Sequence, residues 1–191
     1  MKKKVIKFLD IQKRKVKRFS LPIIMLFVST AAQASCSKLA KAAGMQQTKL
    51  ETIINKLVKI ESTTGKYNVV NHRSGAYGRY QIMPSTAKFY AKKLGIPKHL
   101  WKKPYNQDKI FNAIMKDNIK SLKRNGHKIS AFSIYAIHQQ GAHGFNTIMK
   151  NRPITRRIER NMRKNLPKKY NRTPKSHLRY VWIKYWKNRL G

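Results

Sequence analysis

Acidic residues are scarce in this chain: it has 191 residues, with 6 Asp and Glu against 44 Lys and Arg, and a formal net charge of +38. Such an excess attracts polyanions, namely nucleic acid, an anionic membrane surface or an acidic cell-wall polymer. The only cysteine, Cys36, excludes an internal disulfide. The chain also lacks long apolar runs, repeats and low-complexity segments. Its length is that of about one domain with a real core.

The N-terminus has the three-part pattern of a secretory signal. Residues 1–20 are rich in Lys and Arg, residues 21–28 form an apolar run, and Ala32-Gln33-Ala34 supplies a small-x-small cleavage site. Because the apolar run is much shorter than the ~20 residues that span a bilayer, we predict a removed signal peptide over residues 1–34. The long basic region leaves an uncleaved anchor as the alternative.

Removal of that segment leaves 35 Lys and Arg against 5 Asp and Glu. The positive charge therefore belongs to an exported domain, outside the compartment where most nucleic acid lies. We expect a periplasmic or cell-envelope-associated protein that contacts anionic envelope surfaces and binds no specific nucleic acid.

Cys36 lies two residues after the predicted cleavage site. This position raises a lipoprotein interpretation, in which Cys36 becomes the acylated first residue. Lipoprotein signals usually carry an aliphatic residue three positions before that cysteine, and here the residue is Gln33. We therefore favour an inert thiol, with lipidation as the alternative.

The remainder of the chain has the pattern of helices separated by polar residues. Apolar residues at helical spacing predict a helix over residues 48–60. Ser85 is a suitable N-cap for a second helix that ends near Leu94, and a third is predicted over residues 108–123. Residues 64–83 lack a helical period, so we expect a loop with a small hairpin. The predicted fold class is all-α with this minor β-hairpin.

Two further helices are predicted toward the C-terminus. Ser130 caps an apolar helix that Gly141 and Gly144 interrupt. The segment from His177 onward is basic and has apolar side chains at spacings of three and four: Leu178, Val181, Trp182, Tyr185 and Trp186. A packed amphipathic helix explains this stripe, and an aromatic surface for glycan or membrane is the alternative.

Five acidic residues remain beyond residue 34: Glu51, Glu61, Asp108, Asp117 and Glu159. Glu51 and Asp108 open predicted helices, where the dipole favours a carboxylate. Asp117 and Glu159 lie among Lys and Arg, where pairing on a solvated face explains them. Glu61 instead falls on an apolar helix face at the C-terminal end of its helix. Both features raise a carboxyl pKa, as a general acid requires, although a structural salt bridge is an alternative for this position.

The residues after Glu61 form a specific motif. Glu61-Ser62 is followed by residues 74–87, Ser-Gly-Ala-Tyr-Gly-Arg-Tyr-Gln-Ile-Met-Pro-Ser-Thr-Ala. This stretch resembles the soluble lytic transglycosylase (SLT) family, whose pattern is Glu-Ser, a loop, and Gly-Ala-x-Gly-x-x-Gln-x-x-Pro-x-Thr-Ala. The glycines allow tight turns and close approach of the backbone to a sugar.

The resemblance covers about residues 48–150. It implies a lysozyme-like domain over residues 35–150. Residues 151–191 would then be a basic amphipathic helical C-terminal extension, packed on that domain or continuing it.

The resemblance also implies the roles of individual residues. Glu61 is the single catalytic acid/base, and Ser62 lies beside it to contact substrate. Tyr80, Gln81 and Met83 match the part of the motif that lines the saccharide groove. For Met83 the alternative is core packing, and for Gln81 it is a hydrogen bond that braces the loop.

The second motif of the family, Tyr-Asn-Ala-Gly in a later helix, is altered in this chain. The candidate is residues 133–142, Ser-Ile-Tyr-Ala-Ile-His-Gln-Gln-Gly-Ala. Either Tyr135 or His138 stands at the tyrosine position, and Gln139 replaces the asparagine. All three are predicted substrate contacts, with a structural role for His138 as the alternative.

The implied reaction uses one carboxylate. Glu61 protonates the β-1,4 glycosidic oxygen between N-acetylmuramic acid and N-acetylglucosamine, and the sugar's own C6 hydroxyl then closes a 1,6-anhydro ring. Most glycosidases use two carboxylates, and the motif contains no second one. The histidines lack zinc-type spacing with carboxylates, so we expect no metal or other cofactor.

Two alternatives remain from the sequence. The first is a hydrolytic lysozyme of the same fold, with Asp108 or Asp117 brought near Glu61. The second is a non-catalytic basic protein that binds wall or nucleic acid. The expected partner is the peptidoglycan glycan strand, and service to an envelope-spanning secretion or motility machine is compatible with the sequence.

Overall fold

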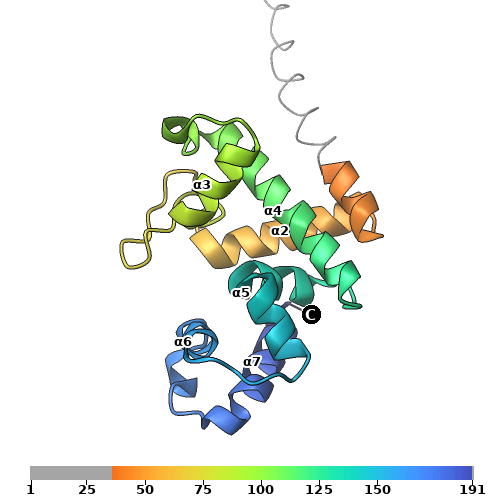
Figure 1. Cartoon of the computed structure of the whole chain (residues 1–191), viewed down its shortest axis with the longest axis vertical. Coiled ribbons are helices and arrows are strands. Elements are labelled where there is room, and N and C mark those ends of the chain that lie inside the picture. Colours follow the sequence, from red (N-terminus) through yellow and green to blue (C-terminus); the bar gives the residue numbers. More distant parts are fainter. Residues whose placement is uncertain (1–35, 191) are drawn as a thin grey trace, which may run out of the picture. The chain divides into compact units, whose positions relative to one another are not determined.

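The computed structural model describes residues 36–190, and the predicted signal peptide over residues 1–34 lies outside this range (Figure 1). Residues 36–43 are helical. The remaining helices are α2 (Gln47–Ser62), α3 (Pro84–Lys93), α4 (Pro104–Arg124), α5 (Ala131–Met149), α6 (Arg156–Lys164) and α7 (Lys175–Leu190), with short 3-10 turns η2 (Lys98–Leu100) and η3 (Lys168–Tyr170). The predicted all-α class is confirmed. Within residues 36–190, no helix is both long and apolar enough to cross a membrane.

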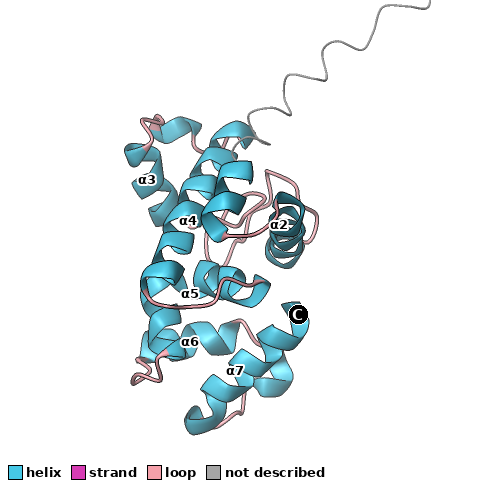
Figure 2. Cartoon of the chain, turned by 90° about the vertical axis from the view of Figure 1, so that its right-hand side faces the viewer, coloured by secondary structure: helices cyan, strands magenta, loops and turns pink. Residues whose placement is uncertain are grey.

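Helix α5 is the centre of the packing. It contacts α2 and α4 on one side and α6 and α7 on the other, and Figure 2 shows the same order from a second direction. One continuous core joins these helices, with fully buried Leu57 from α2, Phe111 from α4, Ile137 from α5 and Trp182 from α7. The C-terminal helices therefore share a core with the helix that carries Glu61.

The packed-helix interpretation of the C-terminal stripe is confirmed. Leu178, Trp182 and Trp186 are buried on α7, and Val181 and Tyr185 are partly buried against the same core. Burial of two tryptophans stabilises the association of α7 with α5 by several kcal/mol, since each large aromatic side chain contributes about 2–3 kcal/mol.

Two predicted helix starts are wrong. Helix α3 begins at Pro84 with Met83 as its N-cap, so Ser85 is not the cap. Helix α4 begins at Pro104, so Asp108 lies in its second turn and does not open it. Proline is favoured at the first helical position because its φ is already helical and its missing N–H would have no partner there.

Glu51 does not open its helix either. Helix α2 begins at Gln47, and the Gln47 Nε2 donates to Glu51 Oε1 at 2.8 Å. The carboxylate is therefore explained by a side-chain pair one turn apart rather than by the helix dipole.

Helix α5 begins as predicted and is interrupted at one of the two predicted glycines. Ser130 and Ser133 form a reciprocal capping box. Gly141 has φ 70° and kinks the helix, whereas Gly144 continues it. A Cβ at Gly144 would lie 3.3 Å from Gln140 Cβ and 3.9 Å from Ile158 Cγ1. A side chain at Gly144 would therefore crowd Gln140 of the same helix, whereas its distance to Ile158 of α6 would be that of an ordinary contact.

The predicted hairpin in the loop after α2 consists of two isolated antiparallel bridges, Val70 with Tyr77 and Tyr77 with Ile82. The fully buried Gln107 of α4 fixes this loop. Its Nε2 donates to the backbone carbonyl of Tyr67 at 2.9 Å, and its Oε1 accepts from the backbone N–H of Arg79 at 3.3 Å. One side chain thus holds both arms of the loop against α4.

Candidate active site

Glu61 lies in the last turn of α2, as the sequence predicts. Its side chain is largely buried, and this burial raises the pKa of its carboxyl from 4.5 to about 7. About half of the molecules therefore carry a protonated Glu61 at neutral pH. A carboxyl with this pKa can both donate and accept a proton under physiological conditions.

The other carboxylates of residues 36–190 all have partners. They accept hydrogen bonds as follows: Glu51 from Gln47, Asp108 from Tyr67 and Tyr80, Asp117 from Tyr90 and Lys93, and Glu159 from Arg163. The predicted pairing of Asp117 and Glu159 with basic residues is confirmed. The carboxyl of Glu61 makes no hydrogen bond or ion pair with another described residue, so it remains available to a ligand.

Ser62 closes the C-terminal end of α2. Its buried Oγ donates to the Val58 carbonyl and accepts from the Gly65 N–H, both at 3.1 Å. Thr63 follows with φ 55° and turns the chain away. Ser62 thus fixes the helix end on which Glu61 sits, and its contact with substrate stays a prediction.

Tyr80 and His138 meet beneath the loop. Tyr80 is buried, its hydroxyl donates to Asp108 Oδ1 at 2.8 Å, and its ring stacks on Phe111 with centroids 3.9 Å apart. His138 contacts the same Phe111 edge-to-face at 5.9 Å. Burial lowers the pKa of His138 to about 4, although an interaction with the Tyr80 backbone opposes this shift. These contacts support a structural role for a neutral His138.

Gln81 and Met83 have different environments. Gln81 has φ 47°, and its Nε2 donates to the carbonyls of Gly78 at 3.0 Å and Val69 at 3.4 Å. These bonds support the interpretation of Gln81 as a brace of the loop, and its contact with substrate stays a prediction. Met83 is 42% exposed at the start of α3, so the core-packing interpretation of this residue is wrong. An exposed thioether at the end of the motif is free to contact a ligand.

Tyr135 lies within the electrostatic reach of Glu61. Burial and then the charge of Glu61 raise the pKa of the Tyr135 hydroxyl. That hydroxyl accepts a hydrogen bond from Gln139 Nε2 at 2.8 Å, and Gln139 Oε1 accepts from Gln140 Nε2 at 3.0 Å. The Tyr135 hydroxyl thus interacts with the charge of Glu61 and bonds Gln139, whereas His138 contacts Phe111 and the Tyr80 backbone.

Helix α7 contributes residues to this site that sequence reasoning did not assign to it. The Tyr135 ring lies 4.5 Å from that of Trp186, and the charge of Arg189 opposes the rise in the Tyr135 pKa. The apolar stripe identified Trp186 only as a packed residue. Nothing distinguishes Arg189 in a tail where basic residues are common, so no signal in the sequence could have found it.

The described residues form a site suited to proton transfer. Within residues 36–190 no three His, Cys, Asp or Glu side chains gather closely enough to hold a metal ion. A carboxyl with a pKa near 7, within electrostatic reach of the Tyr135 hydroxyl, is suited to donate a proton and to recover one.

The raised pKa of Glu61 makes the stability of the protein pH-dependent. In the unfolded chain this carboxyl titrates near 4.5, and in the folded protein near 7. Between these values the folded state holds the extra proton, so the free energy of unfolding falls as the pH rises from about 4.5 to about 7. The shift corresponds to a loss of about 3 kcal/mol above pH 7.

Glu61→Gln removes this titration. We expect the variant to be more stable than the wild type by about 3 kcal/mol near pH 8, and the difference to vanish below about pH 4.5. Urea unfolding of both proteins across this range measures the effect. A stability difference that does not change with pH would contradict the buried, titrating Glu61.

Comparison with known proteins identifies the fold. A family model described as Transglycosylase SLT domain matches residues 38–133, which is just over half of the chain and includes Glu61 and the whole loop motif. No curated protein and no solved structure matches the chain. The chain belongs to the transglycosylase SLT domain family, and its all-α structure has the lysozyme-like fold of that family.

Proposed function

We propose that this protein is a peptidoglycan lytic transglycosylase in which Glu61 is the single catalytic acid/base. Membership of the SLT family supports action on peptidoglycan, outside the cytoplasm. The observation that carries the assignment to Glu61 is its carboxyl, which has a pKa of about 7 and no partner among the described residues.

The reaction follows from these properties. Protonated Glu61 donates its proton to the glycosidic oxygen between N-acetylmuramic acid and N-acetylglucosamine, and the bond from that oxygen to the muramic C1 breaks. The acetamido group of the substrate stabilises the cationic C1. The Glu61 carboxylate then accepts the proton of the C6 hydroxyl, whose oxygen bonds to C1 and closes the 1,6-anhydro ring. No water is consumed, and Glu61 ends protonated for the next cycle.

The remaining carboxylates support this mechanism over hydrolysis. A two-carboxylate lysozyme needs a second free carboxylate as base or nucleophile. Asp108 accepts hydrogen bonds from Tyr67 at 2.9 Å and Tyr80 at 2.8 Å, and Asp117 accepts from Lys93 at 2.9 Å. Both candidates for a second catalytic carboxylate therefore serve structural contacts.

The substrate contacts are part of the proposal. We assign direct contact with the glycan to Met83, which is exposed, and to Tyr135 and Gln139, which bond each other within electrostatic reach of Glu61. Ser62, Tyr80, Gln81 and His138 then act by holding the helix end and the loop in place.

Export and charge complete the proposal. Residues 1–34 direct the protein to the periplasm or cell envelope, where its basic surface holds it on peptidoglycan, whose stem peptides carry carboxylates. Cys36, which lies beside Glu51 and whose pKa burial raises, remains an unmodified thiol in this view.

Mass analysis of the fragments released from purified peptidoglycan tests the function. We expect muropeptides one water lighter than hydrolytic products, because the C6 hydroxyl replaces water as the nucleophile. Fragments with free reducing ends would instead identify a lysozyme of the same fold. Release of no fragments, with wall binding intact, would identify a binding protein.

A further inference from the structure

A groove on the C-terminal part of the chain is the strongest candidate for an additional site. It has a volume of about 490 Å³ and lies between η3 and α7, outside the residues that the family model matches. We call it the Tyr180 groove. Its aromatic and cationic lining consists of Tyr170, Tyr180, Lys184, Tyr185 and Arg189.

The lining combines aromatic faces with cations and contains no carboxylate. Tyr180 is 63% exposed, and the Lys184 Nζ lies 5.5 Å from the centre of its ring. Arg189 Nη1 donates to the Tyr185 hydroxyl at 3.1 Å, and the Tyr170 ring meets the Tyr185 ring at 5.8 Å. Flat amphipathic rings beside cations suit a ligand that has both a ring face and a carboxylate.

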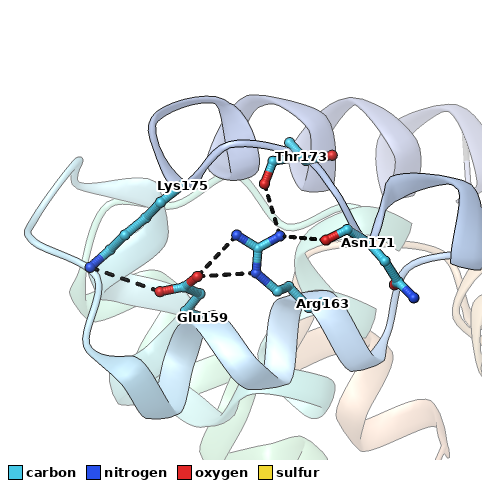
Figure 3. A network of polar contacts seen from close by, with 5 residues as sticks. All are labelled: Glu159, Arg163, Asn171, Thr173 and Lys175. Atoms are coloured by element: carbon cyan, nitrogen blue, oxygen red, sulfur yellow. Dashed lines mark hydrogen bonds and ion pairs between the residues drawn. The ribbon is translucent and has the colours of Figure 1, made fainter.

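Tyr170 forms one wall of the groove, and a polar network ties the segment that follows it to α6 (Figure 3). Arg163 of α6 donates to the backbone carbonyls of Asn171 at 3.0 Å and Thr173 at 2.8 Å. Glu159 accepts from Arg163 at 3.0 Å and pairs with Lys175 at 3.8 Å. The segment that follows Tyr170 is thus tied to α6, so that this wall is preorganised before a ligand binds.

Side-chain packing connects the helix that lines the Tyr180 groove to the catalytic centre. The ring of Tyr185 lies 4.9 Å from that of Trp186, which in turn lies 4.5 Å from Tyr135. Lys56 of α2 donates to the carbonyl of Leu190 at 3.3 Å and so links the helix that carries Glu61 to the end of α7. The groove and Glu61 therefore belong to one packed body, and a long glycan strand is the kind of ligand that can contact both.

We propose that the Tyr180 groove is an accessory subsite for a carboxylate-bearing unit of the glycan strand that Glu61 cleaves. A sugar face lies on the exposed Tyr180 ring, and the carboxylate of the attached lactyl or stem-peptide group meets Lys184 and Arg189. This inference rests on the proposed function, since it takes the same strand as ligand. Charge complementarity supports it, because residues 152–191 contain 14 Lys and Arg and a single acidic residue, Glu159.

A matched pair of double variants tests the subsite in the full chain. The groove variant is Tyr180→Ala with Lys184→Gln. The control is Tyr105→Ala with Lys109→Gln, on α4, where Tyr105 is 62% exposed and Lys109 Nζ lies 4.4 Å from its ring centre. Both pairs have the same residues at the same spacing and lose the same charge. Each is made together with Glu61→Gln so that the wall is not degraded during binding.

Binding is measured by co-sedimentation with purified peptidoglycan and with the same material after amidation of its carboxylates. We expect the groove variant to bind native peptidoglycan about tenfold more weakly and the control less than about twofold more weakly. On amidated peptidoglycan the two variants should bind equally. Thermal unfolding of both variants should match that of the parent, because the altered side chains are exposed.

Three outcomes would overturn the proposal. Equal losses in the two variants would mean that only overall charge matters. A groove-specific loss that persists on amidated peptidoglycan would exclude carboxylate recognition. A groove-specific loss of binding to single-stranded DNA, without loss on peptidoglycan, would make the groove a nucleic-acid site. Fragment analysis with Glu61 intact tests the proposed function separately. Absence of cleavage would refute that function. Cleavage together with equal binding losses in the two double variants would refute the subsite alone.

Discussion

Glu61→Gln is expected to reduce the release of glycan fragments from peptidoglycan by about 10³-fold, within the range typical for loss of a general acid/base. The amide cannot donate a proton to the glycosidic oxygen, and no other described carboxylate is free to replace it. Binding to the wall should persist, because glutamine is nearly isosteric and removes a charge that burial already disfavours. Chromatography of released muropeptides at equal protein concentration measures the rate.

Glu51→Gln is the matched control, because it makes the same change on the same helix at a carboxylate that accepts from Gln47. We expect it to retain most of the cleavage activity. Comparable losses in the two variants would show that Glu61 has no special role, and full activity of Glu61→Gln would refute the proposed mechanism outright.

Gly78→Ala is expected to destabilise the protein by about 3 kcal/mol or more and to abolish cleavage at temperatures where the loop opens. Gly78 has φ +81°, and a Cβ there would overlap Gln107 Oε1 and lie 2.6 Å from Gln107 Cδ. Gln107 cannot move aside freely, because it is fully buried and its side chain bonds the backbone of Tyr67, Arg79 and Lys102. The substitution must displace either the motif loop or α4.

Gly95→Ala is the control, because it introduces the backbone strain of a positive φ without an overlap with another side chain. Gly95 also has a positive φ, +65°, but a Cβ there would meet nothing within 4 Å. We expect a loss of about 1 kcal/mol for this control. Urea unfolding of both variants gives the comparison. A loss for Gly78→Ala no larger than that for Gly95→Ala would show that Gln107 does not constrain the loop.

Local patterns predicted the parts of the site that depend on a few consecutive residues. The apolar spacing over residues 48–60 predicts α2, and the position of Glu61 on the apolar face of that helix predicts the raised pKa that burial produces. The Ser130 cap and the break at Gly141 were likewise predicted, because capping and backbone strain act within one turn. The starts of α3 and α4 differ from the prediction because Pro84 and Pro104, whose φ is already helical, begin these helices ahead of Ser85 and Asp108.

The sequence by itself therefore determined the helical class, the family motif and the one acidic residue that no local pairing explains. The tertiary structure decided what depends on contacts between distant residues. It set Asp108 against Tyr67 and Tyr80, 41 and 28 positions away, so this carboxylate accepts hydrogen bonds from two tyrosine hydroxyls. It also brought Tyr135 within the electrostatic reach of Glu61 and packed Trp186 of α7 against Tyr135. Such contacts depend on how whole helices pack, and that packing is not encoded in any short stretch of residues.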